Sequence, residues 1–223
     1  MNTYIQKMGV DTSKLQFCEV LSLDDWALDM VPRPVTAVLM VFPIKESSEA
    51  HKAAEAAKIA AEGQVVSPNL RYIKQTIGNA CGTIGILHAL ANVAGENESL
   101  LQCASGSYIE KYLKETAEMT GPQIAEYLDN DDELEATHAS AATEGTTAVP
   151  ADNTSVDTHF NAFIVRDGHL YEMDGRKEGP VNHGLCEEGR LLEGATAVMR
   201  GFMDRDPGEV RFTICALAAP VTF

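Results

Sequence analysis

The strongest constraint on the fold is the dipeptide Asp167-Gly168, which separates two apolar segments, 160–165 and 170–173. Asp-Gly in this position is the strongest short-range signal for a β-hairpin with a two-residue turn. We therefore expect two antiparallel strands whose facing ends, Arg166 and His169, close the turn. A hairpin with a fixed turn also has a fixed register, so the residues that face one another can be inferred from the sequence.

The predicted register brings an acid and a histidine together on one face of the hairpin. It sets Asp174 across from Asn161, and His159 lies on the same strand face as Asn161 because side chains alternate along a strand. His159 and Asp174 then become diagonal neighbours with Cα atoms roughly 7–8 Å apart, a span that their side chains can bridge. His169, by contrast, belongs to the turn, where we expect it to be exposed.

Several further segments carry clear strand or helix signals and together predict an α+β domain. The near-continuous apolar run 35–42 lies between prolines and is too short for a buried helix, so it fits a central strand. The segment 81–94 is the most apolar helical stretch and predicts a buried helix whose small residues let neighbours approach closely. The remaining predicted elements are helices at 22–30, 48–62, 107–119, 120–128 and 188–204 and a strand at 211–218.

Residues 137–157 interrupt this pattern with a composition of Ala, Thr, Ser, Gly and Asn that shows no apolar periodicity. We interpret them as a long mobile loop, and a loop of this length inside a compact domain is usually functional or a linker. Strong elements lie close to the loop on both sides, which disfavours a division into two domains. We therefore predict a single domain, 1–223, with this loop over its face.

The charge balance limits the partners that the protein can bind. The chain has 33 Asp and Glu against 17 Lys and Arg, a formal net charge of −16. Such a surface repels phosphate backbones and anionic lipid head groups, which disfavours nucleic acid and membrane partners and favours a basic one. No apolar run approaches the ~20 residues of a membrane span, no secretory signal opens the chain, and its five cysteines form no C-x-x-C pattern. We expect a soluble, cytoplasmic protein with free thiols.

The segment around Cys81 carries the chemistry. A thiol in the first turn of a buried helix lies beside unpaired backbone N–H groups and the positive end of the helix dipole, which favour the nucleophilic thiolate. Gln75, a little upstream, can supply a side-chain N–H that joins the Cys81 backbone amide in an oxyanion hole. His159 is the candidate general base, with Asp174 fixing its orientation while the second ring nitrogen faces Cys81. From residue types alone, a buried inert cysteine is the alternative interpretation.

We assign no chemistry to the other histidines. His88 lies along the apolar helix and is interpreted as a core histidine. His51, His138 and His183 have no acidic partner at a suggestive spacing. A metal site at His183 and Cys186 would need further ligands that no spacing supplies, so we predict neither a metal nor a cofactor.

Three motifs surround the candidate nucleophile, base and acid: Gln75-Thr-Ile-x-Asn-Ala-Cys81-Gly-Thr-Ile-Gly, His159 on a strand, and Leu170-Tyr-Glu-x-Asp174-Gly-Arg176. Together they resemble the ubiquitin carboxyl-terminal hydrolases, the papain-like cysteine peptidases of family C12, in their short single-domain form. Within that family the sequence is most similar to isozyme L3 and its close relatives. Further similar segments extend the resemblance over nearly the whole chain; they are 30–34, 38–43, 137–138, 144–145, 182–184 and 202–212.

The resemblance implies a papain-like α+β fold, with a central, mainly antiparallel sheet flanked by helices and a knotted backbone. It also implies that Cys81 attacks the carbonyl of the terminal glycine of ubiquitin, while His159 accepts and returns the proton. Asp174 orients His159, and Gln75 stabilises the oxyanion. Residues 139–157 correspond to a crossover loop above the active site that admits only small adducts or unfolded tails. Several members of the family also accept NEDD8.

The resemblance also marks substrate contacts and departures from the family pattern. Asn79, Val156 and Thr158 correspond to positions that contact the substrate, although Thr158 stands where the family has a larger apolar residue. The N-terminal segment of the family forms an edge strand that touches ubiquitin, and we expect it to be missing here. Residues 95–104 exceed the corresponding segment in length and are interpreted as a surface insertion.

We therefore interpret the chain as a monomeric thiol hydrolase that acts on ubiquitin, with NEDD8 as a second implied partner. Two alternatives stay open: a protein that mainly holds free ubiquitin and hydrolyses slowly, and a papain-like peptidase with another substrate. The tail of ubiquitin carries arginines, so acidic residues of this chain, including some of 129–135, can steer that tail towards the cleft.

Overall fold

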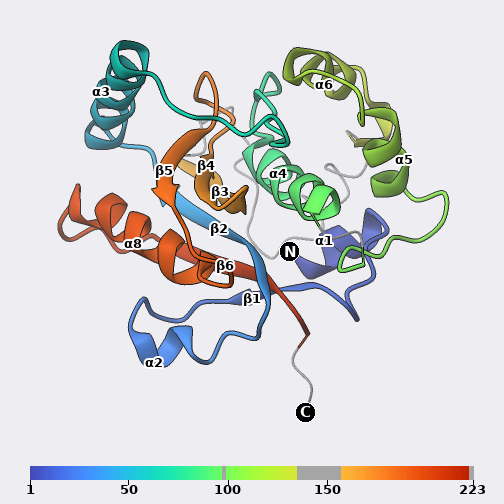
Figure 1. Cartoon of the computed structure of the whole chain (residues 1–223), viewed down its shortest axis with the longest axis horizontal. Helices are drawn as coiled ribbons and strands as arrows, with labels where there is room; N and C mark the ends of the chain where they lie inside the picture. Colours follow the sequence, from blue (N-terminus) through green and yellow to red (C-terminus); the bar gives the residue numbers. More distant parts are fainter. Residues whose placement is uncertain (97–98, 135–156, 221–223) are drawn as a thin grey trace.

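The structure is a computed structural model in which residues 1–96, 99–134 and 157–220 are described. Its centre is a six-stranded antiparallel sheet in the order β1-β6-β2-β3-β4-β5 (Figure 1). The strands are β1 (Gln16–Glu19), β2 (Val35–Pro43), β3 (Thr158–Arg166), β4 (His169–Met173), β5 (Val181–Leu185) and β6 (Thr213–Ala218). His138, Val156 and the predicted loop up to residue 156 lie outside the described residues.

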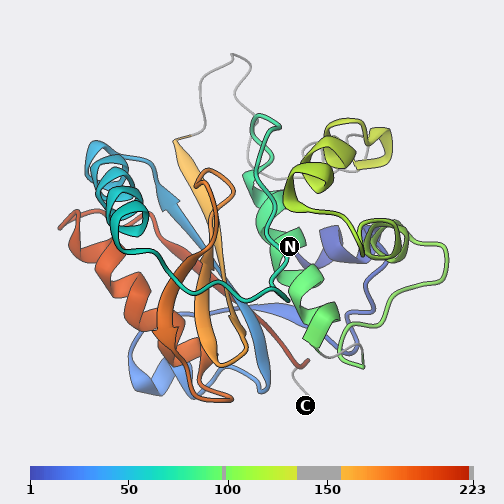
Figure 2. The ribbon, with the colours of Figure 1, turned by 45° about the horizontal axis from the view of Figure 1, so that its top comes forward.

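Helices cover both sides of the sheet. They are α1 (Asn2–Lys7), α2 (Asp25–Leu28), α3 (Glu46–Glu62), α4 (Cys81–Glu96), α5 (Tyr108–Glu115), α6 (Gly121–Asp129) and α8 (Leu191–Asp204). α3 and α8 lie on one side, and α1, α4, α5 and α6 lie on the other (Figures 1 and 2). No helix among the described residues is long and apolar enough to cross a membrane. The flanked antiparallel sheet is the architecture that the resemblance implied, whereas the knotted path stays a prediction.

The central strands β2 and β3 are buried on both faces because α4 packs on one face and α8 on the other. Successive strand residues point to opposite faces. Leu39 accordingly belongs to the same core cluster as Leu87 of α4, while Met40 belongs to the cluster of Met199 of α8. Burial on two faces explains the continuous apolar run at 35–42 and confirms its prediction as a central strand.

The hairpin of β3 and β4 has the predicted register. Arg166 pairs with His169, and Ala162 pairs with Met173. The turn residues Asp167-Gly168 have positive φ angles of 50° and 74°. This left-handed conformation at both central positions is what a type I′ turn requires, and Asp and Gly adopt it readily.

Three elements are absent from the sequence prediction: α1, β1 and β5. Both edge strands are short and rich in polar residues, so neither shows the alternation that marks a half-buried strand. β1 pairs with β6 at one edge of the sheet. β1 follows α1 in the chain, and the expectation that the family's N-terminal segment is missing stays a prediction.

The structure also corrects the predicted exposure of His169. This residue begins β4, is half-buried, and its Nδ1 lies 3.3 Å from Oδ1 of Asn182 in β5. The unpredicted strand β5 covers it. Three predicted helices are shorter than expected: α2 covers only Asp25–Leu28, α5 ends at Glu115 and α8 begins at Leu191.

Candidate active site

Cys81 is the first residue of α4, as the sequence predicted. The preceding Asn79 has a positive φ of 58°, a left-handed conformation that asparagine tolerates better than most residues. Ala80 then accepts the first helical hydrogen bond, from the Ile84 N–H at 2.9 Å. The backbone therefore changes from a left-handed residue to the helix within two residues. This places the thiol among the unpaired N–H groups of the first turn.

Two glycines bring α4 close to β3. A Cβ atom at Gly82 would lie 3.4 Å from the Phe160 ring, and one at Gly85 would lie 3.5 Å from the Phe160 Cβ. Larger residues at these positions would push the helix away from the strand. Because Phe160 follows His159 directly, this close approach brings the Cys81 thiol to the His159 imidazole.

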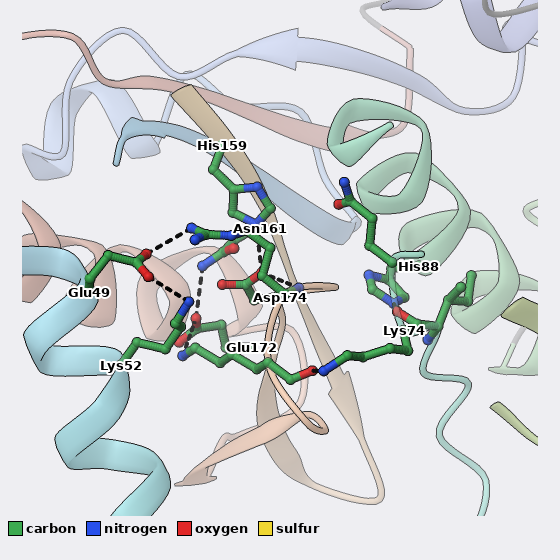
Figure 3. Close-up of polar contacts among 12 residues, drawn as sticks. Glu49, Lys52, Lys74, His88, His159, Asn161, Glu172 and Asp174 are labelled. Atoms are coloured by element: carbon green, nitrogen blue, oxygen red, sulfur yellow. Dashed lines mark hydrogen bonds and ion pairs between the residues drawn. The ribbon is translucent and has the colours of Figure 1, made fainter. Parts of the chain in front are cut away.

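The hairpin places His159 against Asp174 as the register predicted. Nε2 of His159 lies 2.6 Å from Oδ1 of Asp174, and the two side chains are only 3% and 4% exposed (Figure 3). The remaining ring nitrogen, Nδ1, is thereby left for Cys81, whose thiol lies near enough to the imidazole for each group to shift the pKa of the other. The structure thus brings the three predicted residues together, and a hydrogen bond joins His159 to Asp174.

The charges and hydrogen bonds of Cys81, His159 and Asp174 favour a thiolate and imidazolium pair. Burial raises the pKa of the Cys81 thiol, but the hydrogen bond and positive charge of His159, with the N–H groups of Phe160 and Gly82, outweigh it and hold the pKa below its ordinary value. Burial likewise lowers the pKa of His159, but the hydrogen bonds to Asp174 and Cys81 raise that pKa to about 9. Asp174 stays ionised because the hydrogen bond and charge of His159 lower its pKa against the effect of burial.

Backbone and aromatic groups hold the pair in place. The Arg176 N–H donates to Oδ1 of Asp174 at 2.8 Å, and the Tyr72 hydroxyl donates to the Asp174 carbonyl at 2.7 Å. Phe42 lies edge-on to the His159 ring, with ring centroids 5.8 Å apart. A buried ring that is fixed on two sides keeps one orientation, which a general base requires.

Gln75 lies against the turn that follows Asp174. Its backbone N–H donates to the Gly175 carbonyl at 2.9 Å, and its side-chain Nε2 donates to the Ile77 carbonyl at 2.9 Å. An amide nitrogen carries two N–H donors, so one of them stays available for a substrate oxygen. Oε1 of Gln75 is buried without a partner among the described residues. This geometry is compatible with the predicted oxyanion role, which stays a prediction.

The predicted substrate contacts are only partly described. Asn79 is exposed beside the start of α4, and Thr158 begins β3 next to His159 and is half-buried. Val156 lies outside the described residues. The contacts that Asn79 and Thr158 make with a substrate stay a prediction.

A buried polar cluster beside the active site was missed from the sequence. The carboxylate of Glu172 is 1% exposed and contacts Asn161 Nδ2 at 2.8 Å (Figure 3). It also contacts Lys177 Nζ at 2.6 Å and His183 Nε2 at 3.0 Å. The statement that His183 lacks an acidic partner was therefore wrong. The hairpin register contained the signal for the contact of Glu172 with Asn161, because Glu172 and Asp174 point to the same face and Asn161 lies across from Asp174.

Among the described residues, the other histidines and the cysteines apart from Cys81 take no part in the arrangement of Cys81, His159 and Asp174. His88 is buried in the core, as predicted, where its Nε2 accepts from the Ile73 N–H at 2.9 Å and burial lowers its pKa to about 4. His51 lies 3.8 Å from Glu55 on the surface of α3, so it too has an acidic partner. All five cysteines are free thiols. Within the described ranges, no group of three or more His, Cys, Asp or Glu residues is arranged to hold a metal ion.

Comparison with known proteins agrees with this geometry. The family model described as ubiquitin carboxyl-terminal hydrolase, family 1, matches residues 1–204. Ubiquitin carboxyl-terminal hydrolase 3 of Arabidopsis thaliana is 38% identical over 98% of this chain and 89% of its own length. Ubiquitin carboxyl-terminal hydrolase isozyme L1 of Homo sapiens is 39% identical over 97% of this chain and 93% of its own length.

A solved structure has the same fold. The UCH37 catalytic domain of Trichinella spiralis, bound to ubiquitin vinyl methyl ester, superimposes with a TM-score of 0.72. The match covers 98% of this chain and 91% of that domain, at 19% sequence identity. The likeness shows that this chain has the fold of that domain. The closer similarity to isozyme L3 stays a prediction.

Proposed function

The chain belongs to the ubiquitin carboxyl-terminal hydrolases, family 1, and on this premise we propose that it releases small adducts or unfolded tails from the C-terminal glycine of ubiquitin. The observation that carries the proposal is the buried His159–Asp174 pair beside Cys81 at the start of α4. A thiol activated in this way is a nucleophile for acyl transfer.

The proposed reaction uses the groups in the order in which the geometry offers them. The Cys81 thiolate attacks the glycine carbonyl carbon, and the resulting oxyanion accepts hydrogen bonds from the Cys81 backbone N–H and the Gln75 amide. Imidazolium at His159 donates its proton to the leaving group, and a thioester to Cys81 remains. Water then attacks the thioester, His159 accepts a proton from that water, and the thiol is regenerated as ubiquitin leaves.

The acidic end of α6 supports a basic partner. Oδ1 of Asp129 accepts a hydrogen bond of 2.6 Å from Thr76, which lies in the segment that leads to Cys81. Asp131 and Asp132 line a cavity of about 510 Å³ beside it. We therefore propose that this region attracts the arginine-bearing tail of ubiquitin. NEDD8 as a second substrate, the monomeric state and the cytoplasmic location stay predictions.

Turnover of a fluorogenic amide at the C-terminus of ubiquitin tests the proposal. Cys81→Ala and His159→Ala should each remove essentially all turnover, because the first lacks the nucleophile and the second lacks its base. Ubiquitin binding to Cys81→Ala should persist. Cys186→Ala, which changes a half-buried thiol elsewhere on the molecule, should keep wild-type turnover. Full activity in Cys81→Ala would overturn the proposed mechanism.

Binding and labelling experiments distinguish the proposed hydrolase from a protein that mainly holds ubiquitin and from a peptidase with another substrate. Calorimetric titration with ubiquitin beside the turnover assay identifies a holding protein, which would bind tightly with negligible turnover. A peptidase with another substrate would react with a generic thiol reagent at Cys81 but not with a ubiquitin vinyl ester. The proposed hydrolase reacts with both.

A further inference from the structure

Helix α3 is held against the rest of the molecule by charged contacts. It has 17 residues and none of them is buried, so apolar packing contributes little to its position. Two ion pairs connect it to the residues that follow the catalytic acid: Glu49 with Arg176 at 2.8 Å and Glu55 with Lys177 at 2.6 Å. The attachment of α3 is therefore concentrated on the turn 174–177.

Lys177 is the more deeply placed of the two cations. Its side chain is 11% exposed, and Nζ lies 2.6 Å from Glu55 Oε2 and 2.6 Å from Glu172 Oε1. Glu172 is fixed in turn by Asn161 (Figure 3) and by His183. An ammonium group between two carboxylates in a buried place is costly to move, because either carboxylate would lose its compensating charge.

The main chain of Lys177 also holds the catalytic acid. Its N–H donates to the Asp174 carbonyl at 2.9 Å. The Tyr72 hydroxyl lies 2.7 Å from the Asp174 carbonyl and 2.6 Å from the Lys177 carbonyl, and so bridges the two ends of the turn. Any displacement of the Lys177 side chain is therefore transmitted to the backbone that presents Asp174 to His159.

We propose that Lys177 is a positioning residue: anchored between Glu55 and Glu172, it fixes the turn 174–177 so that Asp174 stays on His159, and it thereby ties α3 to the active site. The inference rests on the proposed function only in taking Cys81 as the nucleophile. Lys177 itself touches neither the thiol nor the imidazole among the contacts of the described residues.

The sign of a pH effect distinguishes positioning from simple electrostatics. Loss of a nearby positive charge, by itself, would raise the pKa of His159. Loss of orientation would weaken the hydrogen bond with Asp174 and lower that pKa. The other charged or titratable groups that face this region come from α3, α4, α8, β4, β5 and the connecting segments; they are Glu49, His51, Lys52, Glu55, Tyr72, Cys81, His88, Glu172, Arg176, His183 and Arg205.

The test compares Lys177→Met with Lys58→Met in the full chain. Lys58 lies on the same helix and pairs at 4.0 Å with an exposed Glu62, so its loss removes the same charge without touching the turn. Two readouts are measured across pH: turnover of the ubiquitin amide, and the rate at which iodoacetate alkylates Cys81, followed by peptide mapping. Iodoacetate is an anion that imidazolium attracts, so this rate reports the protonation of His159 without needing ubiquitin.

We expect Lys177→Met to lower kcat about tenfold with little change in KM, a size typical of misplaced catalytic groups. The alkaline limb of the pH profile of Lys177→Met should lie about 1 pH unit lower than that of the wild type, both for turnover and for alkylation. The two profiles of Lys58→Met should match those of the wild type. Lys177→Arg, which keeps the charge, should restore most of kcat. An upward shift, or a profile equal to that of Lys58→Met, would overturn the inference.

A second variant keeps the test valid if Lys177→Met fails to fold. The double variant Lys177→Met with Glu172→Gln also removes the buried carboxylate charge that would otherwise lose its partner. This variant should therefore fold, and the alkaline limb of its pH profiles should stay below that of the wild type. A limb at the wild-type position in the folded double variant would overturn the inference. If wild-type Cys81 is alkylated with the expected pH profile but the ubiquitin amide is not hydrolysed, the proposed function fails and the positioning role stands.

Discussion

The pKa of about 9 for His159 predicts the alkaline end of the pH range over which the proposed mechanism can work. The thiolate and imidazolium pair exists between the lowered pKa of Cys81 and the raised pKa of His159. Activity should therefore fall on the alkaline side as His159 loses its proton near pH 9. The hydrogen bond to Asp174 is the largest of the influences that raise this pKa. The pH at which activity falls on the alkaline side therefore depends on the Asp174 carboxylate.

Asp174→Asn tests that dependence. The amide removes the charge and weakens the hydrogen bond, so the pKa of His159 falls and the alkaline limb should move to lower pH. We expect kcat/KM at neutral pH to fall roughly 100-fold, because the imidazole also loses its fixed orientation. A pH–rate profile of ubiquitin amide turnover measures both effects. An unchanged alkaline limb would contradict the assignment of Asp174.

Gly175 is a second residue at which close contact determines the outcome. A Cβ atom there would lie 2.9 Å from Gln75 Cβ and 3.0 Å from Ile84 Cγ2. Gly175→Ala should therefore displace Gln75 from the turn, lower the free energy of unfolding by about 1–3 kcal/mol and reduce kcat. Gly179→Ala, with no atom within 4 Å of the added Cβ, is the matched control. Equal stability and activity in urea unfolding and turnover assays would refute this account of the contact.

The sequence predicted the relation between His159 and Asp174 because the turn type fixes the register of a hairpin. It predicted the place of Cys81 because the apolar helix begins there. The direction of the Gln75 amide was out of reach, since it depends on a rotamer that the Ile77 carbonyl selects. The partnership of His183 with Glu172 was missed because β5 was missed, and without that strand nothing places His183 near Glu172.

At the scale of elements, the left-handed turn between β3 and β4 sets the register on which the active site depends. Gly168 has a φ of 74°, so Gly168→Ala should lower the free energy of unfolding by about 1–2 kcal/mol through backbone strain alone. No neighbouring atom lies within 4 Å of the added Cβ, so turnover per folded molecule should stay near that of the wild type. Urea unfolding with Gly201→Ala as the control measures this. Loss of turnover without loss of stability would show that the turn contributes in another way.

Elements with a strong local pattern were predictable and the sheet edges were not. β2, α4 and the hairpin are long or have a distinctive turn, and their apolar residues fit one period. β1 and β5 form only because β6 and β4 offer them a free edge to pair with. That pairing is a tertiary event, which local propensity does not reveal. α3 was predicted from its alanines and its glycine cap, but its attachment through ion pairs with Arg176 and Lys177 has no local signal.

For the whole molecule, the net charge of −16 predicts how the rate of association depends on salt. The proposed attraction between the acidic surface and the basic tail of ubiquitin would act over distances comparable to the Debye length of about 8–10 Å at ordinary ionic strength. Raising salt should therefore slow association while the chemical step changes little. Stopped-flow association and single-turnover rates, measured side by side, separate the two. Association that is insensitive to salt would mean that the acidic surface has no part in capture.

The central claim is that Cys81, activated by His159, is the nucleophile that attacks the C-terminus of ubiquitin. Treatment of the wild type, Cys81→Ala and His159→Ala with a ubiquitin vinyl ester, followed by mass spectrometry of the adduct, tests it most directly. We predict one adduct, at Cys81, in the wild type, none in Cys81→Ala, and greatly slowed labelling in His159→Ala. An adduct on another cysteine, or no adduct on a wild-type protein whose Cys81 reacts with a generic thiol reagent, would contradict the claim.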